Sequence, residues 1–229
     1  MPRTARVVIA NQPHHIVQRG HNRQVVFAHA DDYGLYLETL KEWKAQLKCK
    51  VYAYCLMTNH VHLVIDPGAK AENLALLMKR VAGRYTRYIN KKEFRTGTVW
   101  EGRYKSSLID KGEYLLACCR YVELNPVRAG VVLSPEGYRW SSYSAKAGLV
   151  NEAWLDHDAF YLGLGTNDKS RQARYRKWMN ESVAQEEEEL IRQAARRNQL
   201  TGGSRFVDEI ESKMGRRIEL RGRGRPKKT

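Results

Sequence analysis

A chain of 229 residues is long enough for one domain of ordinary size with an appendage, and its 42% hydrophobic content is sufficient for a packed core. It has 40 Lys and Arg residues against 25 Asp and Glu residues, which gives a formal net charge of +15. This composition excludes an intrinsically disordered protein, and the positive surplus points to a polyanionic partner, most often nucleic acid.

Membrane, secretory and disulfide-rich classes are also disfavoured. The sequence has no run of ~18 apolar residues, and its start lacks the apolar core of a signal peptide. No Cys-x-x-Cys spacing occurs, which argues against a zinc knuckle or a disulfide framework; the cysteines are Cys49, Cys55, Cys118 and Cys119. We therefore expect a cytoplasmic protein with no membrane partner.

Strands and helices alternate through the first two thirds of the chain. The expected elements are a strand at 7–19 interrupted at Pro13, a helix from Asp31-Asp32 to Leu47, a strand at 51–65, a helix from about Asn73, a loop and strand at 94–109, and a helix at 111–124 that ends before Asn125-Pro126. This order predicts an α+β fold of ferredoxin type, with an antiparallel sheet and helices on one face. A parallel doubly wound sheet is the alternative, but its Gly-rich phosphate-binding signature is missing, so no nucleotide cofactor is expected.

The composition changes after about residue 165. Short helices with few large apolar residues are expected at 168–180, 183–198 and 204–215, and the glutamates of 186–189 are expected on a solvated helix face. We therefore divide the chain into a catalytic domain at 1–148, a linker at 149–165, a small helical DNA-binding appendage at 166–215 and a flexible basic tail at 216–229.

Two histidines near the end of the strand at 51–65 are candidate metal ligands. Successive strand side chains point to opposite faces, so His60 and His62 share one face while Val61 and Leu63 point into a core. Two imidazoles side by side resemble half of a metal site. Any two histidines two residues apart in a strand match this pattern, however, so the pair indicates a metal site only if further ligands can be found.

The helix at 111–124 supplies candidates for a third ligand and a nucleophile. Tyr121 and Asn125 are four residues apart and share a helix face if the helix runs that far. Tyr114 and Cys118 have the same spacing, but an amide oxygen suits the hard cations of phosphoryl chemistry better than a thiol does. The spacing alone favours a simpler alternative, in which both tyrosines are core aromatics and Asn125 caps the helix.

Three separated motifs, in order, resemble those of the HUH single-tyrosine transposases, most closely the REP-associated tyrosine transposases within the IS200-like group. They are Ala53-Tyr54-Cys55-Leu56-Met57-Thr58-Asn59-His60-Val61-His62-Leu63-Val64, Trp100-Glu101-Gly102-Arg103-Tyr104-Lys105-Ser106 and Arg120-Tyr121-Val122-Glu123-Leu124-Asn125-Pro126-Val127-Arg128-Ala129-Gly130. The resemblance covers roughly residues 3–148. Many relatives have glutamine where Asn125 stands, and both residues offer an amide oxygen.

This resemblance implies an enzyme that cleaves and rejoins hairpin-flanked, REP-like single-stranded DNA through a 5′-phosphotyrosine intermediate. By motif position, Tyr121 is similar to the nucleophile, and His60, His62 and Asn125 are similar to the metal ligands. The implied cofactor is a divalent metal, Mg²⁺ or Mn²⁺. Related proteins work as dimers or as monomers, so a monomer or a homodimer is expected. A domesticated relative that binds repeated hairpins without cutting them is the alternative.

Basic residues beside aromatic ones are candidates for a groove that holds a splayed single strand. They are Arg19, Arg23, Arg84, Arg87, Arg95, Arg103 and Lys105. In the tail, Arg223-Gly224-Arg225-Pro226 resembles the core of an AT-hook, in which Arg223 and Arg225 would enter an A·T-rich minor groove. A nonspecific electrostatic tether fits these residues equally well.

Overall fold

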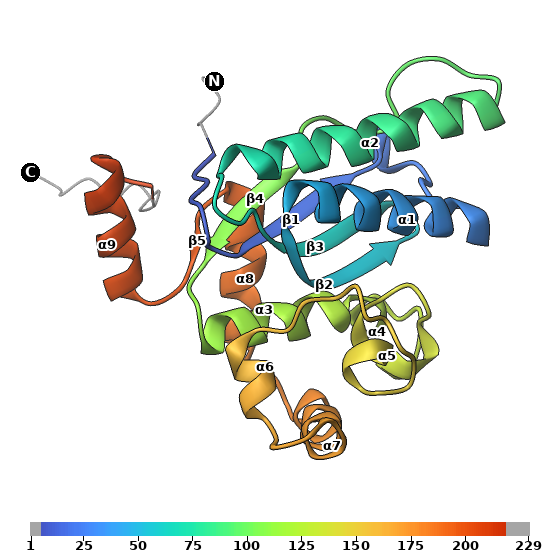
Figure 1. Ribbon diagram of the computed structural model, residues 1–229. Helices are drawn as coiled ribbons and strands as arrows, with labels where there is room; N and C mark the ends of the chain where they lie inside the picture. The colour runs from blue at the N-terminus through green and yellow to red at the C-terminus, as the bar shows by residue number, and fades with distance from the viewer. Residues whose placement is uncertain (1–5, 219–229) are drawn as a thin grey trace, which may run out of the picture.

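The chain, described for residues 6–218 in a computed structural model, folds around one five-stranded sheet in the order β2-β3-β1-β4-β5 (Figure 1). The strands are β1 (His14–Arg19), β2 (Lys50–Met57), β3 (His60–Asp66), β4 (Lys105–Ile109) and β5 (Leu200–Thr201). All neighbours pair antiparallel except β4 and β5, which are parallel. The predicted α+β class with a ferredoxin-like order of strands is confirmed, and the doubly wound alternative is wrong.

Helices cover both faces of the sheet, which corrects the expectation of helices on one face. Figure 1 shows α1 (Ala30–Leu47) and α2 (Glu72–Lys92) above the sheet, and α3 (Glu113–Glu123) and α8 (Gln185–Arg197) below it. The reason lies in β2, where every residue after Lys50 is buried. Val51 and Leu56 join the core under α1 and α2, while Ala53 and Cys55 join a second core with α3, so both faces of this strand need a cover.

The apolar run at 51–65 is a hairpin rather than the single strand that its composition predicts. Thr58 and Asn59 form the turn between β2 and β3. Their carbonyl groups accept backbone hydrogen bonds from an earlier segment, Asn59 from Gly20 at 2.8 Å and Thr58 from Val26 at 2.8 Å. The turn is therefore held by long-range contacts, and the sequence alone marks it only by Asn59.

The remaining elements are the short helices α4 (Asn125–Arg128), α5 (Tyr143–Lys146) and α6 (Ala159–Gly163), the helices α7 (Asp168–Met179) and α9 (Ser204–Met214), and 3₁₀ turns at His21–Arg23 and Pro135–Gly137. Of these, α7 and α9 agree with predicted helices, whereas the short helices and the 3₁₀ turns were not predicted, and α6 lies within the expected linker at 149–165. No helix within residues 6–218 is long and apolar enough to cross a membrane. Most of the basic tail predicted at 216–229 lies outside the described residues, which end at Ile218.

Part of the expected appendage is built onto the central sheet. β5 extends the sheet beside β4, and α8 packs against α3 and β4. α9 packs through Phe206 and Ile210 against Val7 and Leu200. A separately folding appendage at 166–215 stays a prediction, but its second helix and the strand after it belong to the packing of the first domain.

A buried charged group ties α3 to the segments that follow it. The carboxylate of Glu123 is fully buried, accepts a hydrogen bond from Ser142 Oγ at 2.6 Å, and lies 3.3 Å from Nζ of Lys146. The Tyr175 hydroxyl of α7 donates to the same carboxylate. Because an unpaired buried charge is costly, this cluster fixes α3 against α5 and α7.

Replacing Lys146 by Met should destabilise the protein by about 3–5 kcal/mol, because the Glu123 carboxylate then stays buried without its cation. Urea unfolding followed by circular dichroism measures this loss. The double variant Glu123→Gln/Lys146→Met should recover much of it. A single variant that is no less stable than the double variant would show that the ion pair does not hold these segments together.

Candidate active site

A cavity of about 850 Å³ opens at the end of β1 and β3, and three of the four predicted catalytic and metal-binding residues line it: His60, His62 and Tyr121. The described cationic residues around it are Arg6, Arg19, Arg23, Arg103, Lys105, Arg192 and Arg196, and its described carboxylate is Glu101. The cavity therefore combines two imidazoles and a phenol with a strongly positive surround, which suits an anionic ligand.

The hairpin places the two histidines side by side. His60 and His62 have ring centroids 5.0 Å apart, and Val61 and Leu63 lie in the core on the other side of the sheet, as predicted. His60 Nδ1 lies 2.6 Å from the side-chain oxygen of Asn59. Since an amide oxygen only accepts hydrogen bonds, His60 carries its proton on Nδ1 and keeps a lone pair on Nε2.

Both imidazoles are neutral at physiological pH. Burial lowers the pKa of His60 to about 4, and the positive charge of Arg19 adds to this effect. Burial lowers the pKa of His62 well below its usual value, with smaller contributions from His15 and His60. A neutral imidazole is the form that binds a metal ion, so the two Nε2 atoms could hold a divalent cation.

A third histidine, His15, lies beneath this pair and was not predicted as a site residue. His15 is fully buried, and its Nε2 lies 2.9 Å from Nδ1 of His62. Its ring also meets the ring of Tyr121 edge-on, at 5.7 Å between centroids. In the β1–β3 register Val17 pairs with His62, so His15 sits two residues along the same face. The sequence does show that His15 and Val17 lie on the same face of their strand. This places His15 near His62 only once the pairing of β1 with β3 is known.

Tyr121 is held by Arg128 from α4. The guanidinium carbon of Arg128 lies 3.9 Å from the centre of the Tyr121 ring, and its Nη2 donates to the Tyr121 carbonyl oxygen at 2.6 Å. Arg128 is in turn 3.7 Å from Glu188 of α8. Burial raises the pKa of the Tyr121 hydroxyl, and the charge of Arg128 acts in the opposite direction. Arg128 thus both orients the ring and favours its ionised form.

Asn125 does not join the other predicted residues in the cavity. Its Nδ2 donates to the carbonyl oxygens of Tyr121 and Val122, both at 3.1 Å, and it is not among the residues that line the cavity. α3 ends at Glu123 and a separate short helix begins at Asn125, so the helix does not run far enough to put Tyr121 and Asn125 on one continuous face. Within residues 6–218 no three His, Cys, Asp or Glu side chains are grouped to hold a metal ion.

The predicted DNA-binding residues divide into two groups. Arg19, Arg23, Arg103 and Lys105 line the cavity, and Arg19 donates to both carboxylate oxygens of Glu101, at 2.7 and 2.9 Å. Arg84 and Arg87 lie on α2, over the other face of the sheet, and Arg84 pairs with Glu42 of α1 at 2.5 Å. Arg95 hydrogen-bonds to the carbonyl of Thr98, also outside the cavity. Arg223 and Arg225 lie outside the described residues.

Comparison with known proteins decides the family. The sequence model of a family described as transposase IS200 like matches residues 9–125. The chain belongs to the IS200-like transposase family. The match spans β1 to the start of α4, and so includes His15, His60, His62 and Tyr121.

Two proteins that resemble this chain, one in sequence and one in fold, carry the description of REP-associated tyrosine transposase. A Haemophilus influenzae protein of that description is 25% identical over 113 residues, which is 44% of this chain and 64% of the relative. A REP-associated tyrosine transposase bound to a REP hairpin has the same fold, with a TM-score of 0.57 at 15% identity over 65% of this chain and 86% of that chain. The chain thus spans a little under two thirds of the length of the curated relative.

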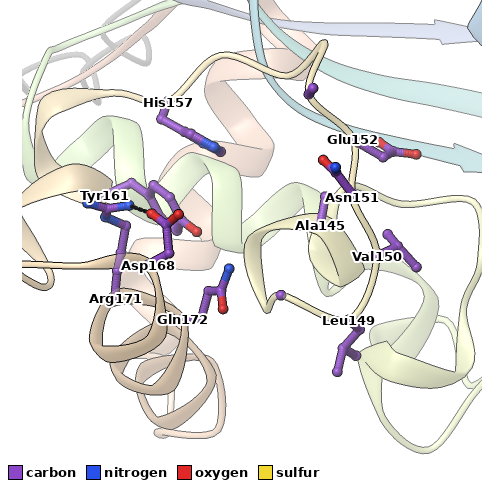
Figure 2. A pocket seen from close by; sticks show the side chains of 12 residues that line it. Ala145, Leu149, Val150, Asn151, Glu152, His157, Tyr161, Asp168, Arg171 and Gln172 are labelled. Carbon is purple, nitrogen blue, oxygen red and sulfur yellow. Dashed lines mark hydrogen bonds and ion pairs between the residues drawn. The ribbon is translucent and has the colours of Figure 1, made fainter.

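A second cavity, about 450 Å³ in volume, lies between the 145–153 segment and α6 and α7 (Figure 2). Its charged groups are already paired. Arg171 is bonded to Asp168, as the dashed line in Figure 2 marks, and Glu152 accepts the Tyr54 hydroxyl at 3.0 Å. The imidazole and the phenol of this cavity face each other, with the His157 and Tyr161 ring centroids 4.6 Å apart, and the Tyr161 hydroxyl donates to the carbonyl oxygen of Lys146 at 2.8 Å.

The bond between His15 and His62 makes a testable difference to metal binding. The Nε2 lone pair of His62 is available to a metal when the His62 proton is on Nδ1, and in that tautomer Nδ1 donates to Nε2 of His15, which stabilises the ligand form. His15→Phe should therefore weaken Mn²⁺ binding about 10–100-fold, measured by isothermal titration calorimetry on the full chain. His15→Gln, which keeps an acceptor, should bind Mn²⁺ more tightly than His15→Phe.

His14→Phe is the matched control, because His14 is equally buried in the same strand but hydrogen-bonds to the backbone of Ile9 instead. Its Mn²⁺ affinity should stay close to that of the unchanged protein. If the His14 and His15 variants lose affinity equally, or neither does, the role given to His15 is wrong.

Proposed function

We propose that this chain is a metal-dependent transposase that cleaves and rejoins hairpin-flanked, REP-like single-stranded DNA through a 5′-phosphotyrosine at Tyr121. The observation that carries the proposal is the meeting of Tyr121, His60 and His62 in one cationic cavity. A phenol beside two neutral imidazoles, in a surround that attracts phosphate, is the chemistry that a covalent DNA strand transfer needs.

The residues of the cavity fit a divalent metal in part. His60 and His62 would hold Mg²⁺ or Mn²⁺ through Nε2, and Asn125 stays our proposal for the third ligand, which requires its side chain to leave the end of α3. A bound cation would withdraw charge from the oxygens of the scissile phosphate. Mn²⁺ accepts imidazole ligands more readily than Mg²⁺ does, so a two-histidine site favours Mn²⁺.

The proposed reaction exchanges one ester for another. The Tyr121 oxygen forms a bond to phosphorus, the bond from phosphorus to the 3′ oxygen breaks, and the phenolic proton is lost while the 3′ oxygen gains one. The 5′ end stays attached to the protein as a phosphotyrosine. Attack by another 3′-hydroxyl reverses the step and joins two strands, with no nucleotide cofactor consumed.

The pKa of Tyr121 bears on the first step. Burial keeps the pKa of the free phenol above its usual value, so the hydroxyl is protonated before attack and must lose its proton during it. Arg128 over the ring stabilises the negative charge that develops on the phenol oxygen. Arg19, Arg23, Arg103 and Lys105 bind the phosphates on either side.

Tyr121→Phe should abolish a denaturation-resistant DNA–protein adduct and leave DNA binding unchanged. The measurement incubates a labelled, hairpin-bearing single strand with the full chain and Mn²⁺ or Mg²⁺, followed by a denaturing gel. The adduct should also vanish when EDTA removes the metal. Tyr114→Phe is the matched control, because Tyr114 lies in the first turn of the same helix and does not line the cavity. This variant should form the adduct as the unchanged protein does.

An adduct that persists in the Tyr121→Phe variant would show that Tyr121 is not the nucleophile. A binder of repeated DNA hairpins that does not cut is the second candidate function, favoured by the position of Asn125 outside the cavity. That function would be indicated by tight hairpin binding with no adduct under either metal.

A further inference from the structure

Helix α8 forms a wall of the candidate active-site cavity, although it begins 60 residues after the family match ends. Arg192, Ala195 and Arg196 of this helix line the cavity together with His60, His62 and Tyr121. Figure 1 shows α8 under the sheet, beside β4 and close to α3. The chain therefore completes its cavity with a segment outside the part that the family shares.

The position of α8 is fixed along its length and at its end. Ile191, Ala194 and Ala195 form its buried stripe, with Ile191 in the core beneath β2 and α3. At its end Asn198 takes the left-handed conformation, with φ of 54°, and its Oδ1 accepts the backbone N–H of Ser106 in β4 at 3.0 Å. Leu200 and Thr201 then pair with β4. The helix is thus a built part of the cavity.

The stripe next to the buried face is cationic. Arg192 and Arg196 are four residues apart, so their side chains lie one turn apart on the same face. Both are exposed, and Arg192 pairs with Glu189 on the helix itself, an exposed i,i+3 contact that a phosphate can replace at small cost. Arg192 is also near enough to Tyr121 for its charge to lower the pKa of that phenol.

Segments around β1 and β4 carry further charges for the same ligand. Arg23, Arg103 and Lys105 line the cavity from these segments. Tyr104 lines it too, but its side chain is buried and the Arg6 guanidinium lies 3.9 Å from its ring centre, so this pair presents a further cation to the cavity. Cations from α8 and from the segments around β1 and β4 therefore surround one cavity, an arrangement that suits the phosphates of one strand of nucleic acid.

We infer that Arg192 and Arg196 of α8 bind backbone phosphates of a single DNA strand lying in the cavity, so that α8 is part of the DNA-binding surface. This inference rests on the proposed function for the identity of the polyanion. The sequence alone places this helix in a separate DNA-binding appendage, whereas the inference assigns its two arginines to the same cavity as Tyr121.

The test is DNA binding by the full chain, without metal and in the presence of EDTA. Fluorescence anisotropy follows a fluorescein-labelled, mixed-sequence DNA strand with a terminal hairpin over a series of KCl concentrations. Arg192→Gln and Arg196→Gln should each weaken binding several-fold at low salt. Each should also reduce the slope of log affinity against log salt by about 0.7, the value for one phosphate contact on a single strand.

Arg197→Gln is the matched control, because Arg197 has the same charge on the same helix, is exposed and does not line the cavity. Its salt slope should equal that of the unchanged protein. The inference would be overturned if all three variants lost DNA affinity equally, or if Arg192→Gln and Arg196→Gln lost none. It would also be overturned if these two variants bound a blunt-ended duplex more weakly by the same factor as the single strand, because the helix would then contact paired DNA.

This outcome is separable from that of the proposed function. Binding without metal requires neither strand cleavage nor the Tyr121 hydroxyl. If the unchanged protein forms the adduct but the α8 variants bind DNA normally, only the role of α8 is refuted. If the unchanged protein forms no adduct but the α8 variants show the reduced salt slope, only the cleavage reaction is refuted.

Discussion

The antiparallel pairing of β1 with β3 is the constraint on which the candidate site depends. It sets Val17 opposite His62 and brings His15 beneath the His62 ring. A shift of one residue in this register would move His15 to the other face of the sheet, into the core under α1 and α2. The register is held by apolar residues on both faces, with Ile16 and Leu63 on one side and Val64 on the other. Packing on both faces of the sheet therefore fixes the hydrogen bond that orients a candidate ligand.

The second requirement is the placement of Tyr121, and this comes from segments that follow it in the chain. α3 is anchored on one side by the buried Glu123 carboxylate and its partners in α5 and α7. On another side α8 packs against it, and Arg128 bridges Tyr121 to Glu188 of that helix. The glutamates of α8 are thus more than a solvated face, because one of them holds the arginine that orients the candidate nucleophile.

Local patterns in the sequence predicted most of the helices and strands, whereas the features that depend on long-range contacts were not predicted. The strand alternation of His60 and His62 is a local pattern, and so is the spacing of three and four residues between apolar side chains that predicts α1 and α2. The structure agrees with both. The break after Glu123 was anticipated from Pro126, yet its effect on Asn125 was not, because a short second helix reorients that residue. The role of His15 and the place of α8 in the cavity were missed, although the helix itself was predicted. A register between strands and the docking of a helix that is distant in the chain leave no local signal. The sites where local rules fail are those assembled from several segments.

The charges of the cavity link DNA attraction to metal binding. Burial lowers the pKa of His15, His60 and His62. The charge of Arg19 lowers the pKa of His60 further, and the charge of Arg128 does the same for His15 and His62. The cations that would draw a phosphate chain into the cavity therefore add to the effect of burial in keeping the imidazoles neutral, which is the form that binds a metal. A divalent cation adds positive charge to this surround and is disfavoured there on its own, whereas a phosphate strand offsets that repulsion. It follows that metal and DNA should bind this cavity cooperatively, each raising the affinity of the other by the same factor.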